Sequence, residues 1–187
     1  MSVEPRGDPR ATIDPDVSDV RAAQRDLAAF GALYRRYLDR VYGYCFYLLG
    51  DHHDAEDATE RTFLAALGAI GRYRDEGASF RSWLFRIAHN QIANALRARG
   101  RHRATPLDGV SVPALGGDPA GLVGQAEESR RLRRALDTLA DDRRQVIILR
   151  FVDGLSAREI GVVLGRSPGA VRVLQHRALR DLAALLA

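Results

Sequence analysis

The sequence has few of the residues that would indicate a secreted or membrane-spanning protein. It contains 187 residues with one cysteine, Cys45, one tryptophan and one methionine. A single cysteine excludes a disulfide framework within the chain and is typical of a reducing compartment, so we expect a cytoplasmic protein. There is no run of about 18 apolar residues, and the polar N-terminus lacks the apolar core of a signal peptide. We therefore expect neither a membrane span nor export.

Lysine is absent as well, because all 28 basic residues are arginine. The formal net charge is +4, and residues 127–187 carry the whole excess, with 12 arginines against 8 acidic residues. Arginine presents a forked set of donors that suits phosphates and guanines. The charge distribution is consistent with a nucleic-acid partner for the last third of the chain, although a solvated arginine-rich helix would produce the same excess.

Composition divides the chain into four parts. Residues 1–25 are polar and rich in proline and aspartate, which predicts a disordered tail. Residues 26–100 contain three stretches with apolar residues at steps of three and four, the pattern of amphipathic helices. Residues 101–126 hold prolines and glycines without a helical period, which predicts a flexible linker, and residues 127–187 are again helical. We expect an all-α fold of two small helical domains, the second containing a helix-turn-helix.

The boundaries of the first helices can be predicted from their caps. One helix ends at Leu49, where Gly50 suits a C-terminal cap, and Cys45 lies on its apolar side as a core residue. The next helix begins after Asp51, a good N-cap. A third helix is expected from Ser82 onward.

The stretch DHHDAEDATE, residues 51–60, is the densest in side chains of the ligand type. A metal or catalytic site is one interpretation, but His52 and His53 would point about 100° apart on a helix, and no HExxH motif is present. We therefore predict no metal site, no cofactor and no enzymatic activity. A merely solvated helix start and a protein-docking face remain as alternatives. The carboxylates expected to gather on one outer face are Asp54, Glu56, Asp57 and Glu60.

Residues 155–182 carry the signals of a helix-turn-helix. Ser156 and Glu159 form the capping box of a first helix. A turn at Gly165 follows, and Ser167 with Pro168 then starts a second helix. Two short helices joined by a tight turn that contains glycine predict this motif.

The second of these helices divides into an apolar and a polar side. The residues expected to pack inward are Val171, Leu174, Ala178, Leu182 and Leu185. The residues expected to meet DNA are Ser167 and Pro168 at the helix start, then Arg172, Val173, Gln175, His176, Arg177 and Arg180. A recognition helix needs both sides, one to hold its pose and one to meet phosphates and base edges. The alternative is an ordinary helical hairpin with a solvated basic face.

Three segments in this order resemble the extracytoplasmic-function (group IV) sigma factors of bacterial RNA polymerase. They are DAEDATERTF at 54–63, SWLFRIAHN at 82–90 and GLSAREIGVVLGRSPGAVRVLQHRAL at 154–179. The resemblance extends from about Ala29 to the C-terminus. It implies a transcription initiation factor that binds core RNA polymerase, recognises minus-ten and minus-thirty-five promoter elements and assists melting.

The resemblance also implies roles for individual residues. Residues 26–100 would be sigma region 2 and residues 127–187 sigma region 4. The four carboxylates would dock on the clamp coiled coil of the largest polymerase subunit, and the 167–180 helix would read the minus-thirty-five duplex. The residues implied in capturing minus-ten bases and holding the non-template strand are Arg74, Phe80, Arg81, Trp83, Arg86, Asn90, Asn94 and Arg97.

Two alternatives stay open at this point. Phe80, Trp83 and Phe85 could be core residues instead of stacking platforms. The whole chain could also be a stand-alone helix-turn-helix regulator with a helical sensor or dimerisation domain. The resemblance further implies control by a separate anti-sigma protein.

Overall fold

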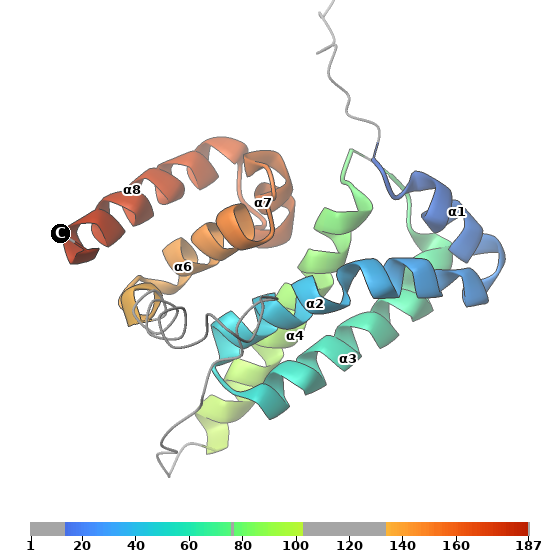
Figure 1. Ribbon diagram of the computed structural model, residues 1–187, viewed down its shortest axis with the longest axis horizontal. Helices are drawn as coiled ribbons and strands as arrows, with labels where there is room; N and C mark the ends of the chain where they lie inside the picture. The colour runs from blue at the N-terminus through green and yellow to red at the C-terminus, as the bar shows by residue number, and fades with distance from the viewer. Residues whose placement is uncertain (1–13, 76, 103–133, 187) are drawn as a thin grey trace, which may run out of the picture.

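The computed structural model describes residues 14–75, 77–102 and 134–186, and within these ranges every regular element is a helix (Figure 1). The expected all-α class is confirmed. The elements are α1 (Val17–Arg25), η1 (Leu27–Ala29), α2 (Phe30–Leu49), α3 (His52–Ala69), η2 (Ile70–Arg72), α4 (Phe80–His102), α6 (Asp141–Ile147), η4 (Ile148–Val152), α7 (Ala157–Leu164) and α8 (Pro168–Leu186). No helix in the described ranges is both long enough and apolar enough to cross a membrane. The predicted linker falls almost entirely outside these ranges.

The predicted caps position α2 and α3. Gly50 adopts a left-handed conformation with φ 73°, and its N–H bonds to the carbonyl of Phe46, which ends α2. The side chain of Asp51 accepts a hydrogen bond of 3.0 Å from the backbone N–H of Asp54, which starts α3. This sharp reversal lays α3 against α2, and α4 packs on both helices (Figure 1).

The core of this bundle is apolar. The residues with no exposed surface include Leu33, Val41, Tyr44, Cys45, Ala55, Ala66, Leu84, Phe85 and Ala88. Cys45 has no exposed surface, so its predicted role as a core residue is confirmed, and burial raises the pKa of its thiol to about 12.

Helix α1 is a correction to the sequence prediction, which assigned residues 1–25 to a disordered tail. Residues 1–13 lie outside the described ranges, but residues 17–25 form a helix whose Val20 and Ala23 are buried. The helix is held by distant partners: the buried carboxylate of Asp16 accepts hydrogen bonds from Arg36 and Tyr37 of α2. The residues of α1, VSDVRAAQR, contain no proline, so only the residues before this helix carry the composition that predicted disorder.

The C-terminal part is built around α8. Residues 134–137 are helical, and α6 begins at Asp141. The interruption between two helices that was predicted near residues 140–142 is therefore confirmed. Ala178 and Leu182 of α8 pack with Leu136, Leu139 and Ile147. The prediction that Leu185 packs inward is wrong, because this cluster ends one turn earlier and leaves Leu185 exposed.

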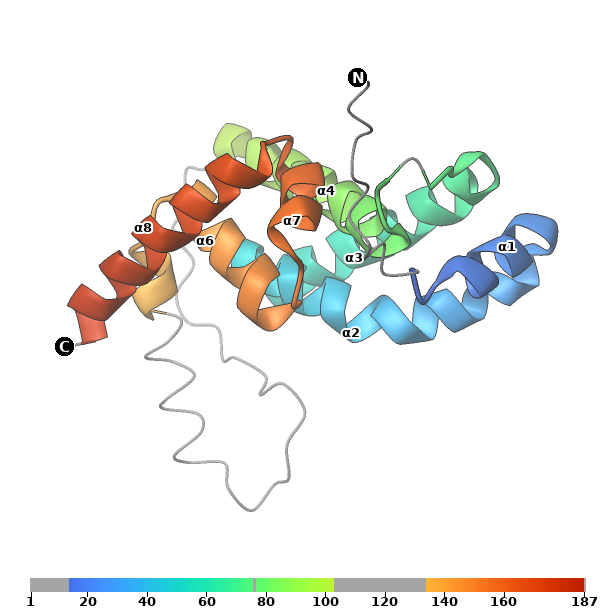
Figure 2. The ribbon, with the colours of Figure 1, turned by 90° about the horizontal axis from the view of Figure 1, so that it is seen from above.

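The two parts share one apolar core. Helix α7 packs against α4, and η4 packs against α2 (Figures 1 and 2). Leu155 and Ile160 from the C-terminal part have no exposed surface and belong to the same cluster as Phe80 and Leu84. In this structure the two helical parts are therefore in direct contact.

Candidate nucleic-acid interface

Helices α7 and α8 form the predicted helix-turn-helix. Ser156 Oγ accepts from the N–H of Glu159 at 3.2 Å, and Glu159 Oε2 accepts from the N–H of Ser156 at 2.8 Å, so the predicted capping box is confirmed. Gly165 ends α7 with φ 64°. Ser167 Oγ then accepts from the N–H of Ala170 and caps α8. These caps fix where α7 ends and α8 begins.

The turn between these helices is tight. A Cβ atom added at Gly161 of α7 would lie 2.6 Å from the backbone carbonyl oxygen of Arg166. This distance is much shorter than any van der Waals contact, so only glycine allows α7 and the turn to approach this closely.

Helix α8 presents the polar face predicted for a recognition helix. Val171, Leu174 and Ala178 are buried against the rest of the C-terminal part, as expected. The exposed residues of the predicted DNA-facing set are Ser167, Pro168, Arg172, Val173, His176, Arg177 and Arg180, and Gln175 is half-buried at the border. The exposed side offers three guanidinium groups and the apolar Val173, the side-chain types that meet phosphates, guanines and thymine methyls.

Helix α4 separates its predicted site residues into an exposed row and a buried cluster. The exposed row consists of Arg86, Asn90, Asn94 and Arg97, at steps of four, four and three residues. Phe80 has no exposed surface and packs against Tyr37 and Tyr73, so it belongs to the core and cannot stack on a base in this structure. Trp83 is half-buried, with its ring 5.0 Å from that of Tyr73.

The loop before α4 is fixed by α1. Gln24 of α1 donates to the carbonyl oxygens of Ile70 and Tyr73, at 3.1 and 2.9 Å. Asp14 accepts from the N–H of Phe80 at 2.7 Å and so satisfies the start of α4. Arg74 is exposed and borders a hollow of about 520 Å³ between α1 and the loop.

The four predicted docking carboxylates divide between two sides of α3, so the expectation of a single acidic face is wrong. Asp54 forms an ion pair with Arg99 of α4, and Asp57 pairs with Arg61 at 3.5 Å. Both acids border a small hollow between α3 and α4. Glu56 and Glu60 instead lie on the side that faces α2, because residues 54 and 56 are about 200° apart around a helix.

Glu56 and Glu60 line a groove between α2 and α3. Its volume is about 710 Å³, and it combines these acids and Asp39 with apolar and aromatic side chains. Tyr34 and Leu64, which also line it, are 41% and 60% exposed. An open apolar groove with an acidic rim has the composition of a protein-docking surface.

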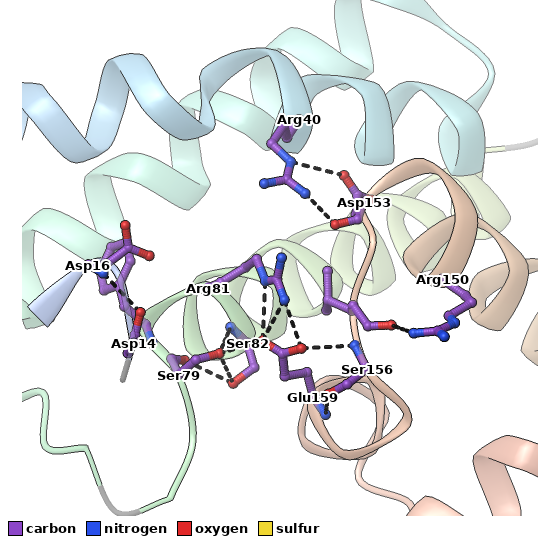
Figure 3. Close-up of polar contacts among 12 residues, drawn as sticks. Asp14, Asp16, Arg40, Ser79, Arg81, Ser82, Arg150, Asp153, Ser156 and Glu159 are labelled. Carbon is purple, nitrogen blue, oxygen red and sulfur yellow. Dashed lines mark hydrogen bonds and ion pairs between the residues drawn. The ribbon is translucent and has the colours of Figure 1, made fainter. Parts of the chain in front are cut away.

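A polar network joins the start of α4 to the start of α7 (Figure 3). Arg81 Nη2 lies 2.8 Å from both carboxylate oxygens of Glu159, and Ser79 Oγ donates to Glu159 at 2.8 Å. Burial acts to raise the pKa of Glu159, but the hydrogen bonds from Ser156, Arg81 and Ser79 together lower it, so the carboxylate is ionised. Arg40 of α2 donates to the backbone carbonyl of Asp153, outside the helix-turn-helix.

Sequence reasoning missed the partners in this network. Glu159 was identified only as a cap, and Arg40 and Asp153 were not identified at all. No spacing in the sequence links them, because Arg81 and Glu159 are 78 positions apart and Arg40 and Asp153 are 113 apart. The one local signal was Asp153-Gly154 before the capping box, which reads as an ordinary turn.

His52 and His53 do not converge on one site. His52 Nδ1 lies 2.6 Å from the Tyr42 hydroxyl and its ring stacks on Phe46, whereas His53 is exposed. In the part of the chain that the structure describes, no three His, Cys, Asp or Glu side chains are arranged to hold a metal ion.

Two family models match the chain. Residues 33–102 match sigma-70 region 2, and residues 129–182 match sigma-70 region 4. The first range contains α3, the loop and α4, and the second contains the helix-turn-helix. The boundaries of both matches agree with the division between the two helical parts.

The chain is also similar to characterised proteins of one kind. It is 36% identical to the ECF RNA polymerase sigma factor BldN of Streptomyces coelicolor, over 89% of this chain and 63% of BldN. It is 35% identical to the ECF RNA polymerase sigma factor SigE of Mycolicibacterium smegmatis, over 99% of this chain and 71% of SigE. Among solved structures, CnrH in complex with the cytosolic domain of CnrY matches with a TM-score of 0.70 and 28% identity, over 91% of this chain and 96% of CnrH.

Proposed function

The chain belongs to the extracytoplasmic-function family of RNA polymerase sigma factors, and we propose that it binds core RNA polymerase and directs it to specific promoters. The observation that carries this proposal is that each matched region folds with its own exposed row of polar and arginine side chains, the types that suit DNA. One row lies on α4 and the other on α8. A regulator that reads one duplex site needs only the second row.

Helix α8 reads the minus-thirty-five element as duplex. Arg172, His176 and Arg180 are exposed at steps of four residues, so they can follow one groove. Val173 is 50% exposed and is suited to a thymine methyl. The buried side of α8 keeps this row rigid against the rest of the C-terminal part.

Helix α4 and the loop before it handle the minus-ten element as a single strand. Asn90 and Asn94 offer amide donors and acceptors to unstacked base edges, while Arg74, Arg86 and Arg97 track the backbone. Arg81 and Trp83, at the start of α4, complete the set of residues assigned to the minus-ten strand. Phe80 is assigned to the core, where it supports Trp83 at a ring-centroid distance of 5.5 Å.

The α2–α3 groove is the main polymerase contact. Glu56 and Glu60 supply negative charge beside an exposed apolar surface, which suits a helix with basic and apolar residues. Asp54 and Asp57 extend the acidic surface around α3 toward Arg99. Residues 26–100 and residues 127–187 are thus the two domains that carry these functions. Because RNA polymerase and the chromosome lie in the cytoplasm, the protein acts there.

A protein inhibitor is a further partner. CnrH was solved in complex with the cytosolic domain of CnrY, and the similarity of the two chains supports a protein partner for this one as well. An anti-sigma protein, as the family resemblance implies, would be such a partner.

The proposal is tested by the requirement for polymerase. Core RNA polymerase should co-purify with the tagged protein, and promoter DNA should be retained only when both proteins are present. A stand-alone helix-turn-helix regulator would instead bind duplex promoter DNA unaided and would fail to retain polymerase. Binding of that kind would replace the proposed function with the alternative.

A further inference from the structure

Helix α1 is fixed to α2 at its N-terminal end. The Asp16 carboxylate has no exposed surface and accepts hydrogen bonds from Arg36 and Tyr37 of α2. A further ion pair joins Asp19 of α1 to Arg36 at 2.6 Å. Hydrogen bonds to a charged group are stronger than those between neutral groups, so α1 is a firm support for the segments that it contacts.

Helix α1 holds the segment between α3 and α4 through the side chain of Gln24. Its Nε2 donates to the carbonyl oxygen of Ile70 at 3.1 Å and to that of Tyr73 at 2.9 Å. An amide nitrogen carries two hydrogens, so both bonds form together. Because Ile70 begins η2 and Tyr73 directly follows it, one side chain fixes both ends of this turn.

The carbonyl of Tyr73 has a second donor, which belongs to the set assigned to the minus-ten strand. Arg74 Nη1 lies 2.9 Å from this oxygen and 3.2 Å from the carbonyl oxygen of Gly71. These two bonds break when the guanidinium turns to a phosphate, whereas the bond from Gln24 remains. Gln24 therefore keeps the backbone of Tyr73 satisfied and in place while Arg74 changes partners.

The start of α4 is tied to the same helix by Asp14. One carboxylate oxygen of Asp14 accepts from the N–H of Asp16 at 3.0 Å, and the other accepts from the N–H of Phe80 at 2.7 Å (Figure 3). The ring of Tyr73 lies 5.9 Å from that of Phe80 and 5.0 Å from that of Trp83. The placement of Trp83 thus depends on two backbone positions that α1 holds.

From these contacts, and resting on the proposed function, we infer that Gln24 and Asp14 are positioning residues for minus-ten recognition. They hold Arg74 and Trp83 in the arrangement that receives the single strand, and they act through these residues instead of contacting DNA. The match to sigma-70 region 2 begins at residue 33, so this role belongs to residues outside the matched range. A segment already held in its binding geometry loses less conformational freedom on binding, which favours the matched sequence.

The test uses Gln24→Glu in the full-length protein. Glutamate has nearly the same shape, but its carboxylate donates no hydrogen bond and repels the two carbonyl oxygens. The matched control is Arg25→Gln, which changes the net charge by the same amount at the exposed neighbouring position of α1.

Two measurements compare these variants with the wild type. Fluorescence anisotropy measures how the holoenzyme binds a labelled non-template minus-ten oligonucleotide from a promoter that the wild type transcribes, and one altered in the minus-ten element. The emission of Trp83, the one tryptophan of the chain, reports its contact with Tyr73 in the free protein.

We expect Gln24→Glu to weaken binding of the matched oligonucleotide about tenfold, to change binding of the altered one little, and to shift the emission of Trp83. Arg25→Gln should keep the wild-type emission and the wild-type ratio of the two affinities. Equal losses on both oligonucleotides in Gln24→Glu, or unchanged binding to both, would overturn the inference. If Gln24→Glu unfolds, Gln24→Ala removes the donors without adding charge and is judged by the same criteria.

The emission of Trp83 is measured without polymerase or DNA. An unchanged emission in Gln24→Glu would therefore count against the contact even if the wild-type holoenzyme selects promoters as proposed. Failure of the proposed function would appear in the wild type, whose holoenzyme would not distinguish the two oligonucleotides, and this would overturn the inference as well.

Discussion

Asp54 and Glu56 are two positions apart on α3 but contact opposite sides of the bundle. Asp54 pairs with Arg99, which also donates to the carbonyl of Leu49 at 2.6 Å and so ties α4 to the α2–α3 turn. Glu56 has no such tie and lines the open groove against α2. The acidic run therefore combines a residue that stabilises the bundle with residues free to meet a partner.

This division predicts different effects of charge reversal. Glu56→Lys with Glu60→Lys should abolish co-purification with core polymerase while the thermal unfolding of the protein stays within a few degrees of wild type, because no described partner of these side chains is lost. The control for net charge is Asp137→Lys with Asp141→Lys, a change of equal charge on the C-terminal part. Both of these acids pair with Arg144, so this control is compared for retention of polymerase and not for stability. Undiminished retention of polymerase by the Glu56/Glu60 variant would remove the groove from the docking surface.

Asp54→Lys should act mainly on stability. It would place a second cation beside Arg99, so we expect a loss of about 1 kcal/mol or more in the free energy of unfolding, measured by urea titration. Unchanged stability with lost polymerase binding would instead assign Asp54 to direct docking.

The recognition helix predicts a sequence-dependent loss. Arg172→Ala should weaken binding of the holoenzyme to its own promoter by about 1–3 kcal/mol if Arg172 contacts a guanine through two hydrogen bonds. Binding to a promoter altered in the minus-thirty-five element should change little. Equal losses on both DNAs would make Arg172 a phosphate contact, and Arg35→Ala, an exposed arginine on α2, controls for the lost charge.

For residues on α4, a role in opening the DNA strands can be distinguished from a role in folding. Asn90→Ala and Arg86→Ala should reduce transcription from duplex promoters, because both side chains are exposed in the row assigned to the single strand. A template melted in advance across the minus-ten element should restore most of that activity if the residues act in opening. Persistent loss on the melted template would point to a defect in folding or polymerase binding.

The tight turn of the helix-turn-helix predicts that alanine substitution has different effects on stability at two glycines. Gly161→Ala should lower the free energy of unfolding by about 1–3 kcal/mol, since the new Cβ would meet the carbonyl oxygen of Arg166 at 2.6 Å. Gly169→Ala is the control, because its Cβ would be 3.9 Å from the nearest atom and alanine favours the helix. Urea titration of both variants compares them, and equal stability would refute the close approach.

Asp153 predicts a pH dependence of stability. Burial raises its pKa to about 7, partly countered by Arg40 and Arg81, and Tyr44 and Cys45 are titratable groups near it. In the unfolded chain the pKa is near 3.8. Below that value both states are protonated and no penalty exists. As the pH rises from about 4 to 7 the unfolded state ionises first, so stability falls, and above about 7 the penalty is constant.

Asp153→Asn should remove the part of the pH dependence of stability that arises from this carboxylate. Urea titrations at several pH values should therefore show a shallower decline between pH 4 and 7 in the variant than in the wild type. A decline of the same slope in both proteins would show that other groups cause it.

The sequence allowed some parts of this structure to be predicted and not others, for physical reasons. Gly50, Asp51 and the Ser156–Glu159 box were predictable because caps act within a few residues. Helix α1 was not, because Asp16 and Gln24 find their partners 20 to 49 positions away. The contact of α7 with α4 escaped prediction for the same reason.

The candidate site follows the same rule. The polar rows on α4 and α8 were predictable from a step of 100° per residue, as was the buried side of α8 up to Leu182. The same step of 100° per residue also predicts that Asp54 and Glu56 lie on different sides of α3. Knowing which side met Arg99 and which met the groove required the position of α2 and α4 in space.

The central claim is that this protein gives RNA polymerase its promoter specificity, and run-off transcription with purified components tests it most directly. Core polymerase is combined with genomic promoter fragments, with and without the protein. We predict discrete transcripts from a subset of fragments that appear only when the protein is present. Identical transcripts in both reactions, or none while polymerase remains active on a control template with another sigma factor, would contradict the account.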